Sequence, residues 1–124
     1  MTIELLQAPA SGPYEIQLTI GRFPFDWQLF DYAPSGGSWS CRALGSGSNV
    51  AWLKLPDDYS TAADLQKHRL VWSVQIINLD TRIQSTDLEI ILESAGKPGA
   101  TPPVVFTVDV DPLRPYFFIA VDVK

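Results

Sequence analysis

RLVWSVQIINL, from Arg69 to Leu79, is the longest run of strand-forming residues in the sequence. Successive side chains of a β-strand point to opposite faces. Trp72, Val74 and Ile76 would therefore share one face, which is wholly apolar. The second face would be formed by Val71, Ser73, Gln75 and Ile77, and we interpret it as mostly apolar. A segment that can bury both faces is typical of a central strand. We therefore expect this stretch at the middle of a sheet.

Shorter segments with the same alternation lie on both sides of this stretch, separated by turns rich in proline and glycine. They cover residues 2–7, 14–20, 27–32, 50–55, 87–93, 104–111 and 116–123. The segment 34–49 holds most of the small residues and predicts an irregular region, in which residues 39–44 could form a short strand between two tight turns. Its glycines are expected to permit positive φ in hairpins or loops.

One short helix is expected near residues 60–67, because Thr61-Ala62-Ala63-Asp64 fits the pattern of a helix capping box. A helix of about two turns is marginal alone and must be held by packing. Together these segments predict an all-β fold, namely an antiparallel β-sandwich of seven or eight short strands, with a squat barrel as the alternative. The length predicts a single domain over residues 1–124.

The charge pattern argues against several partners. The net charge is −5, and the nine lysines and arginines are scattered along the chain. A nucleic-acid partner requires a clustered cationic surface, so none is expected. No stretch approaches the roughly 20 apolar residues that cross a bilayer, so we expect no membrane span. The start carries Glu4 where a secretory signal would be basic, which favours a cytoplasmic location, although export by another route stays open.

Catalytic candidates are few, and the chain is expected not to be an enzyme. His68 is the single histidine, its neighbours Lys67 and Arg69 are both cationic, and no G-x-S-x-G motif accompanies it. It is interpreted as a surface histidine at a turn. The single cysteine, Cys41, is interpreted as a buried and inert thiol, because free cysteine is among the most buried residue types.

Calcium is the one metal that the sequence leaves open, and no other cofactor is expected. Asp109, Asp111 and Asp122 lie on or beside the last two predicted strands. Hard cations take several converging carboxylate and carbonyl oxygens, which such residues could supply. The alternative is that these acidic side chains protect strand edges from pairing with other chains.

The aromatic residues of the glycine-rich region are the strongest indication of a ligand site. Trp39 and Trp52 each lie in a locally polar context, and Asn49 and Arg42 are close enough in sequence to supply hydrogen bonds. An exposed indole beside polar loops is a good platform for a sugar ring or for an apolar group of a partner. These four residues form the predicted ligand site.

The sequence therefore favours a non-catalytic module that binds a small ligand, with carbohydrate as the candidate class, through aromatic residues on Gly/Ser-rich loops. The alternative is a structural or assembly subunit that acts through protein–protein contacts, by self-association into a homo-oligomer or with a partner chain. This alternative is motivated by apolar residues on the second faces of predicted strands, namely Val71, Ile77, Leu79, Ile91, Tyr116 and Phe118. A hydrolytic enzyme using His68 or a pair of carboxylates is a distant third.

Overall fold

The computed structural model describes residues 2–5, 8–35, 37–94 and 102–123 of the 124-residue chain. Within these ranges the chain forms nine strands and one short helix. In chain order they are β1 (Thr2–Leu5), β2 (Tyr14–Ile20), β3 (Phe25–Ser35), β4 (Ser38–Ser48), β5 (Ala51–Lys54), α1 (Ala62–Leu65), β6 (Arg69–Ile76), β7 (Gln84–Ser94), β8 (Val104–Val110) and β9 (Tyr116–Val123).

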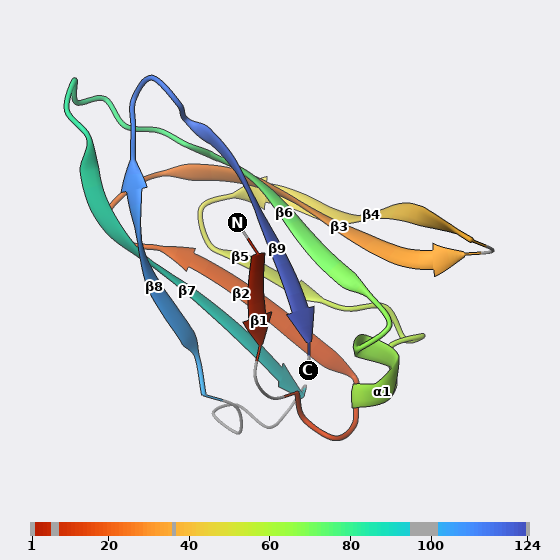
Figure 1. Ribbon diagram of the computed structural model, residues 1–124. Helices are drawn as coiled ribbons and strands as arrows, with labels where there is room; N and C mark the ends of the chain where they lie inside the picture. Colours follow the sequence, from red (N-terminus) through yellow and green to blue (C-terminus); the bar gives the residue numbers. More distant parts are fainter. Residues whose placement is uncertain (1, 6–7, 36, 95–101, 124) are drawn as a thin grey trace.

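The strands form two sheets that pack face to face (Figure 1). One sheet has the order β1-β9-β6-β3-β4, and the other has the order β5-β2-β7-β8. All neighbouring strands are antiparallel except β1 and β9, which are parallel. The predicted all-β sandwich is confirmed. The described part of the chain has nine strands because the uncertain strand at 39–44 does form and is longer than expected.

The stretch that starts at Arg69 is the central strand of the larger sheet. β6 pairs with β3 on one side and with β9 on the other. Its inner face is formed by the fully buried Trp72, Val74 and Ile76, and burial of each such side chain contributes about 1.5–3 kcal/mol to stability. The strand ends at Ile76, three residues earlier than the pattern predicted, and Leu79 lies in the following loop.

The glycine-rich segment departs from the prediction of an irregular region. β3 and β4 form a long hairpin, whose outer end projects beyond the rest of the sandwich (Figure 1). Gly47 lies within β4 opposite Trp27, and a Cβ atom at Gly47 would lie only 3.1 Å from the indole Nε1. Glycine is needed here because the indole occupies the space of a side chain, and not because the backbone requires positive φ. Gly37 is the described glycine that has positive φ, at 86°.

The predicted helix is confirmed and covers one end of the sandwich (Figure 1). The Asp64 amide donates to Thr61 Oγ1, and the Thr61 amide donates to Asp64 Oδ2, which completes the capping box. Leu65 anchors this short helix in the core. Among the described residues, no helix is both long enough and apolar enough to cross a membrane.

Candidate functional site

The outer face of the five-stranded sheet carries a row of polar side chains across four strands. Residues paired across strands share a face of the sheet. Asp26 of β3 lies opposite Ser48 of β4 and Gln75 of β6, and Gln75 in turn lies opposite Tyr116 of β9. Ser48 Oγ donates a hydrogen bond to Asp26 Oδ1 at 2.6 Å. This row therefore runs from hydroxyl and carboxylate groups to an exposed phenol ring.

A second row lies two residues further along each strand. Gln28 of β3 is paired with Ser46 of β4 and with Ser73 of β6, and Ser73 is paired with Phe118 of β9. Phe118 is largely exposed. The two rows thus repeat one arrangement, with polar groups over β3, β4 and β6 and an aromatic ring over β9.

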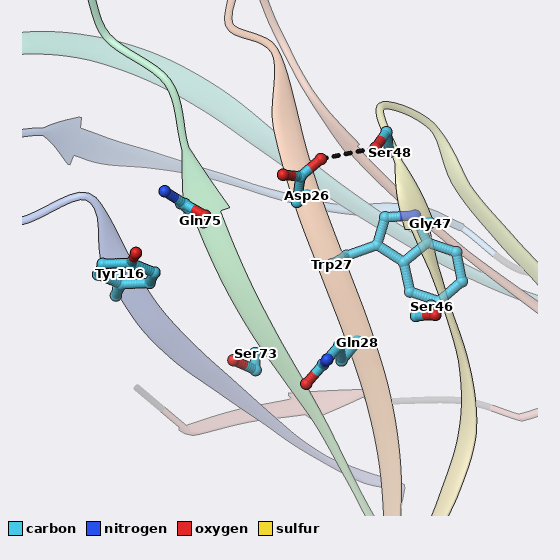
Figure 2. A pocket seen from close by; sticks show the side chains of 9 residues that line it. All are labelled: Asp26, Trp27, Gln28, Ser46, Gly47, Ser48, Ser73, Gln75 and Tyr116. Carbon is cyan, nitrogen blue, oxygen red and sulfur yellow. Dashed lines mark hydrogen bonds between the residues drawn. The ribbon is translucent and has the colours of Figure 1, made fainter.

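The side chains of the two rows, apart from Phe118, line a hollow of about 440 Å³ on the surface. Figure 2 shows Tyr116 at one side of it, the β4 residues at the other side, and the two glutamines with Ser73 between them. Gln28, Ser73 and Gln75 make no side-chain hydrogen bond with any described residue. A glutamine amide has two N–H donors and one carbonyl acceptor. These groups are therefore free to bind a polar ligand.

A second hollow, of about 290 Å³, lies on the same outer face toward the end of the β3–β4 hairpin. Its lining includes Tyr32, Trp39, Arg69 and Val71. Trp39 is 63% exposed. The Arg69 guanidinium donates two hydrogen bonds to Asp122, from Nε to Oδ1 at 2.8 Å and from Nη2 to Oδ2 at 2.7 Å. This second hollow is aromatic and apolar, with one paired cation at its border.

The structure separates the two predicted ligand-binding tryptophans. Trp39 lies on the outer face of the larger sheet, whereas Trp52 lies on β5 of the smaller sheet, opposite Gln17 of β2. Trp52 is 53% exposed. Both indoles are therefore accessible, but they cannot contact one small ligand together because they belong to different layers of the sandwich.

The other two predicted ligand residues have contacts within the fold. Asn49 has φ 64°, and its backbone N–H donates to the Phe25 carbonyl at 2.6 Å. It therefore forms the turn between β4 and β5. Arg42 lies opposite Asp31 of β3, on the side of β4 away from Trp39, and its Nη2 lies 3.2 Å from Asp31 Oδ2. The sequence alone could not predict that Arg42 and Trp39 lie on opposite faces, because this requires knowing that residues 38–48 form one strand.

Asp31 is the centre of a buried polar cluster near α1. Its side chain faces the core and only 3% of the residue is exposed. Oδ1 accepts a hydrogen bond from His68 Nδ1 at 2.8 Å, and the Tyr59 ring lies edge-on to the imidazole with 4.5 Å between centroids. Arg42 Nη2 also donates to the Tyr59 hydroxyl at 3.1 Å. Burial, and then a hydrogen bond with Asp31, raises the pKa of Tyr59.

His68 is therefore not the surface histidine that the sequence predicted, since it is largely buried and paired with a carboxylate. An aspartate that accepts from Nδ1 orients imidazole in many general-base sites. No hydroxyl or thiol of a described serine, threonine or cysteine is hydrogen-bonded to His68. In this arrangement His68 serves as a hydrogen-bond partner of a buried carboxylate.

The three aspartates considered for calcium lie in two places. Asp109 accepts from Ser85 Oγ at 3.1 Å, and Asp111 accepts from the Leu113 amide at 2.9 Å. Asp122 is bound to Arg69 on the other sheet, as described above. Within the described ranges, no group of three histidine, cysteine or acidic residues gathers as metal ligands would. The fold thus keeps Asp122 apart from the other two.

Cys41 is exposed rather than buried. It lies on the outer face of β4 opposite Tyr32 of β3, and a hydrogen bond with Cys41 raises the pKa of the Tyr32 hydroxyl. The prediction of a buried thiol was wrong because β4 is an edge strand whose outer face meets solvent.

No protein-family model matches this sequence, and neither a curated protein nor a solved structure does. The candidate site is therefore defined by its geometry.

Sequence reasoning did not identify Gln28 or Gln75, and it assigned Tyr116 to a surface for protein–protein contacts and not to a ligand site. A signal was present, because Ser73 and Gln75 are polar residues at alternate positions of the central strand. Polar side chains at alternate positions of a buried strand indicate that this face meets solvent.

Proposed function

We propose that this protein is a non-catalytic module that binds a polyhydroxylated ligand of the carbohydrate class on the outer face of its five-stranded sheet. The observation that carries this proposal is that Gln28, Ser73 and Gln75, whose side chains have no hydrogen-bond partner among the described residues, line one hollow with the exposed ring of Tyr116. Gln28 and Gln75 each offer donors and an acceptor within one hollow. Tyr116 borders the same hollow and is largely exposed.

The chemistry of the hollow matches that of a sugar. Sugar hydroxyls both donate and accept hydrogen bonds, as do glutamine amides and serine hydroxyls. The C–H face of a sugar ring packs against an aromatic ring, which offers an apolar body with a polar tip in the case of tyrosine. Ligand sites typically combine such an apolar surface with a small number of positioned polar groups.

The proposal keeps one of the predicted ligand residues and replaces the others. Trp39 lies on the proposed face. Trp52 lies on the opposite sheet, Asn49 shapes a turn, and Arg42 is bound to Asp31. Calcium has no part in the proposal, because the aspartates considered for it do not line the first hollow.

The test is isothermal titration with ligands selected by a glycan array. Removal of one hydrogen bond costs about 1 kcal/mol, so Gln75→Ala should weaken binding roughly fivefold. Tyr116→Ala should weaken it further, by removing the ring contact. Gln17→Ala, which changes the same residue type on the outer face of the other sheet, is the matched control and should bind like the wild type. A wild-type protein that binds no glycan, or two site variants with unchanged affinity, would reject the proposal.

A second candidate function is assembly with another protein chain, and it has a separate observation in its favour. Leu79 and Leu113 are 96% and 89% exposed. They lie in the β6–β7 and β8–β9 loops. Asn78 of the first loop donates a hydrogen bond from Nδ2 to the carbonyl of Val110, the last residue of β8, at 3.2 Å. Two nearly bare leucines on adjoining loops are unusual for a solvated surface and are typical of contact sites.

Light scattering over a wide concentration range tests this second candidate in its self-association form. The wild type should show a mass that rises with concentration, whereas Leu79→Ser combined with Leu113→Ser should remain monomeric. A monomer at every concentration for the wild type would count against self-assembly through these loops.

A further inference from the structure

The second hollow on the five-stranded sheet indicates how long the ligand is. An inference about ligand length rests on the proposed function, because both hollows lie on the proposed binding face. The first hollow is lined by Asp26 of β3 and the second by Tyr32 of the same strand. A strand rises about 3.3 Å per residue, so these two positions lie roughly 20 Å apart. One sugar ring cannot reach from the Asp26 end of the first hollow to the Tyr32 end of the second.

The surface between the two hollows is open to an extended ligand. The hollows adjoin on β6, where Ser73 lines the first and Val71, two residues away, lines the second. Val71 is paired with Phe30 of β3 and with Ala120 of β9. All three side chains are partly exposed and uncharged. No charged side chain of these paired positions therefore separates the hollows.

The second hollow offers the groups that a further sugar unit would need. Trp39 provides a broad exposed ring, and Tyr32 lies in the same hollow. Arg69 uses Nε and Nη2 to bind Asp122, so its charge is compensated while its remaining N–H groups can still donate. Aromatic rings would thus contact the ligand at both ends of the face, with hydrogen-bonding amides nearest to Tyr116.

We infer that the ligand is an oligosaccharide, not a single sugar, and that it lies along β3 from the hollow beside Tyr116 to the hollow beside Trp39. Trp39 then acts as a distal contact that is reached only by longer chains. Its removal should affect affinity in a manner that depends on ligand length.

The experiment measures affinity for matched mono-, di- and hexasaccharides of the hexoses and hexosamines, by array and then by titration. The hexasaccharide should bind the wild type about tenfold more tightly than the disaccharide, and Trp39→Ala should abolish this gain while leaving the disaccharide affinity unchanged. Trp52→Ala, a tryptophan of similar exposure on the opposite sheet, is the matched control and should behave as the wild type for every ligand. Trp39→Phe should retain part of the gain.

The outcomes separate this inference from the function on which it rests. If the disaccharide binds as tightly as the hexasaccharide, or if Trp39→Ala weakens both equally, the extended site is wrong while sugar binding stands. If no member of the series binds the wild type, both are wrong. Thermal unfolding midpoints of all variants should match the wild type, because both tryptophans are exposed, and a variant that fails this check is replaced by the phenylalanine substitution.

Discussion

Oδ1 of Asp31 lies 2.8 Å from Nδ1 of His68, and this contact joins the central part of the fold to the end that α1 covers. An ionised carboxylate only accepts hydrogen bonds, so the imidazole carries a proton on Nδ1. Arg42 binds the other oxygen of Asp31. A buried carboxylate without such partners would be strongly destabilising.

Removal of the Asp31 charge should therefore destabilise the protein. We expect Asp31→Asn to lower the free energy of unfolding in urea by about 1.5–3 kcal/mol, because the charge-assisted hydrogen bonds from His68 and Arg42 to the carboxylate are weakened or lost. His68→Phe keeps a ring beside Tyr59 but removes the hydrogen bond. The double variant should be about 1–2 kcal/mol more stable than the sum of the two single losses predicts. Strict additivity would show that the two residues do not interact, and the exposed Asp109→Asn serves as the control.

The contact between Trp27 and Gly47 gives a second prediction. A Cβ atom at Gly47 would lie 3.1–3.2 Å from three atoms of the buried indole. Gly47→Ala should therefore cost about 1–3 kcal/mol of stability through overpacking. In the double variant, Trp27→Phe should recover much of the stability that Gly47→Ala loses, because the phenyl ring is smaller than the indole. Ser46→Ala changes the neighbouring residue on the opposite face of β4 and should cost less than about 0.5 kcal/mol. If Gly47→Ala leaves the free energy of unfolding unchanged while Trp27 is present, the packing explanation is wrong.

The capping box predicts how stability depends on acidity. Hydrogen bonds from Ser60, and then from Thr61, lower the pKa of the Asp64 carboxyl below its usual value. The Asp64 carboxylate makes its full contribution to the free energy of unfolding above about pH 4, the usual pKa of an aspartate in an unfolded chain. This contribution is lost as the pH falls through the lower pKa of the folded state. The thermal midpoint of Asp64→Asn should accordingly lie below that of the wild type at neutral pH.

In acid the two midpoints should converge, because the wild-type carboxyl is then protonated as well. Asp57 is an exposed aspartate outside the capping box, so Asp57→Asn is the control and should have the thermal midpoint of the wild type at neutral pH. A difference between wild type and Asp64→Asn that persists below the folded-state pKa would mean that the charge is not what matters.

The exposure of Cys41 predicts ready chemical modification. The thiol should react fully with a thiol-specific reagent in the native protein, at a rate within about tenfold of that of the unfolded chain, because thiol reactivity depends on access and on the thiolate fraction. Cys41→Ser should alter stability by less than about 0.5 kcal/mol and should abolish labelling. Labelling that requires denaturant would place the thiol in the interior.

Part of the candidate site could be predicted locally. Trp39 was identified because its neighbours in sequence are small and polar, and the structure places it on the surface. Gln75 and Tyr116 were not linked, although they lie opposite each other on β6 and β9. They are far apart in the chain, and only strand order and register bring them together. A shift of the register by one residue would place Tyr116 on the other face.

The sequence by itself determined the class of the fold and its local signals. Alternation with a period of two is a property of the chain, because successive side chains of a strand point to opposite faces, and it predicted the central strand at Arg69. The capping box at Thr61 is equally local. The tertiary structure alone decided that Trp39 and Trp52 lie on different layers, that Gly47 makes room for Trp27, and that Asp31 binds His68. These relationships join distant segments, and they depend on pairing between strands that no local pattern specifies.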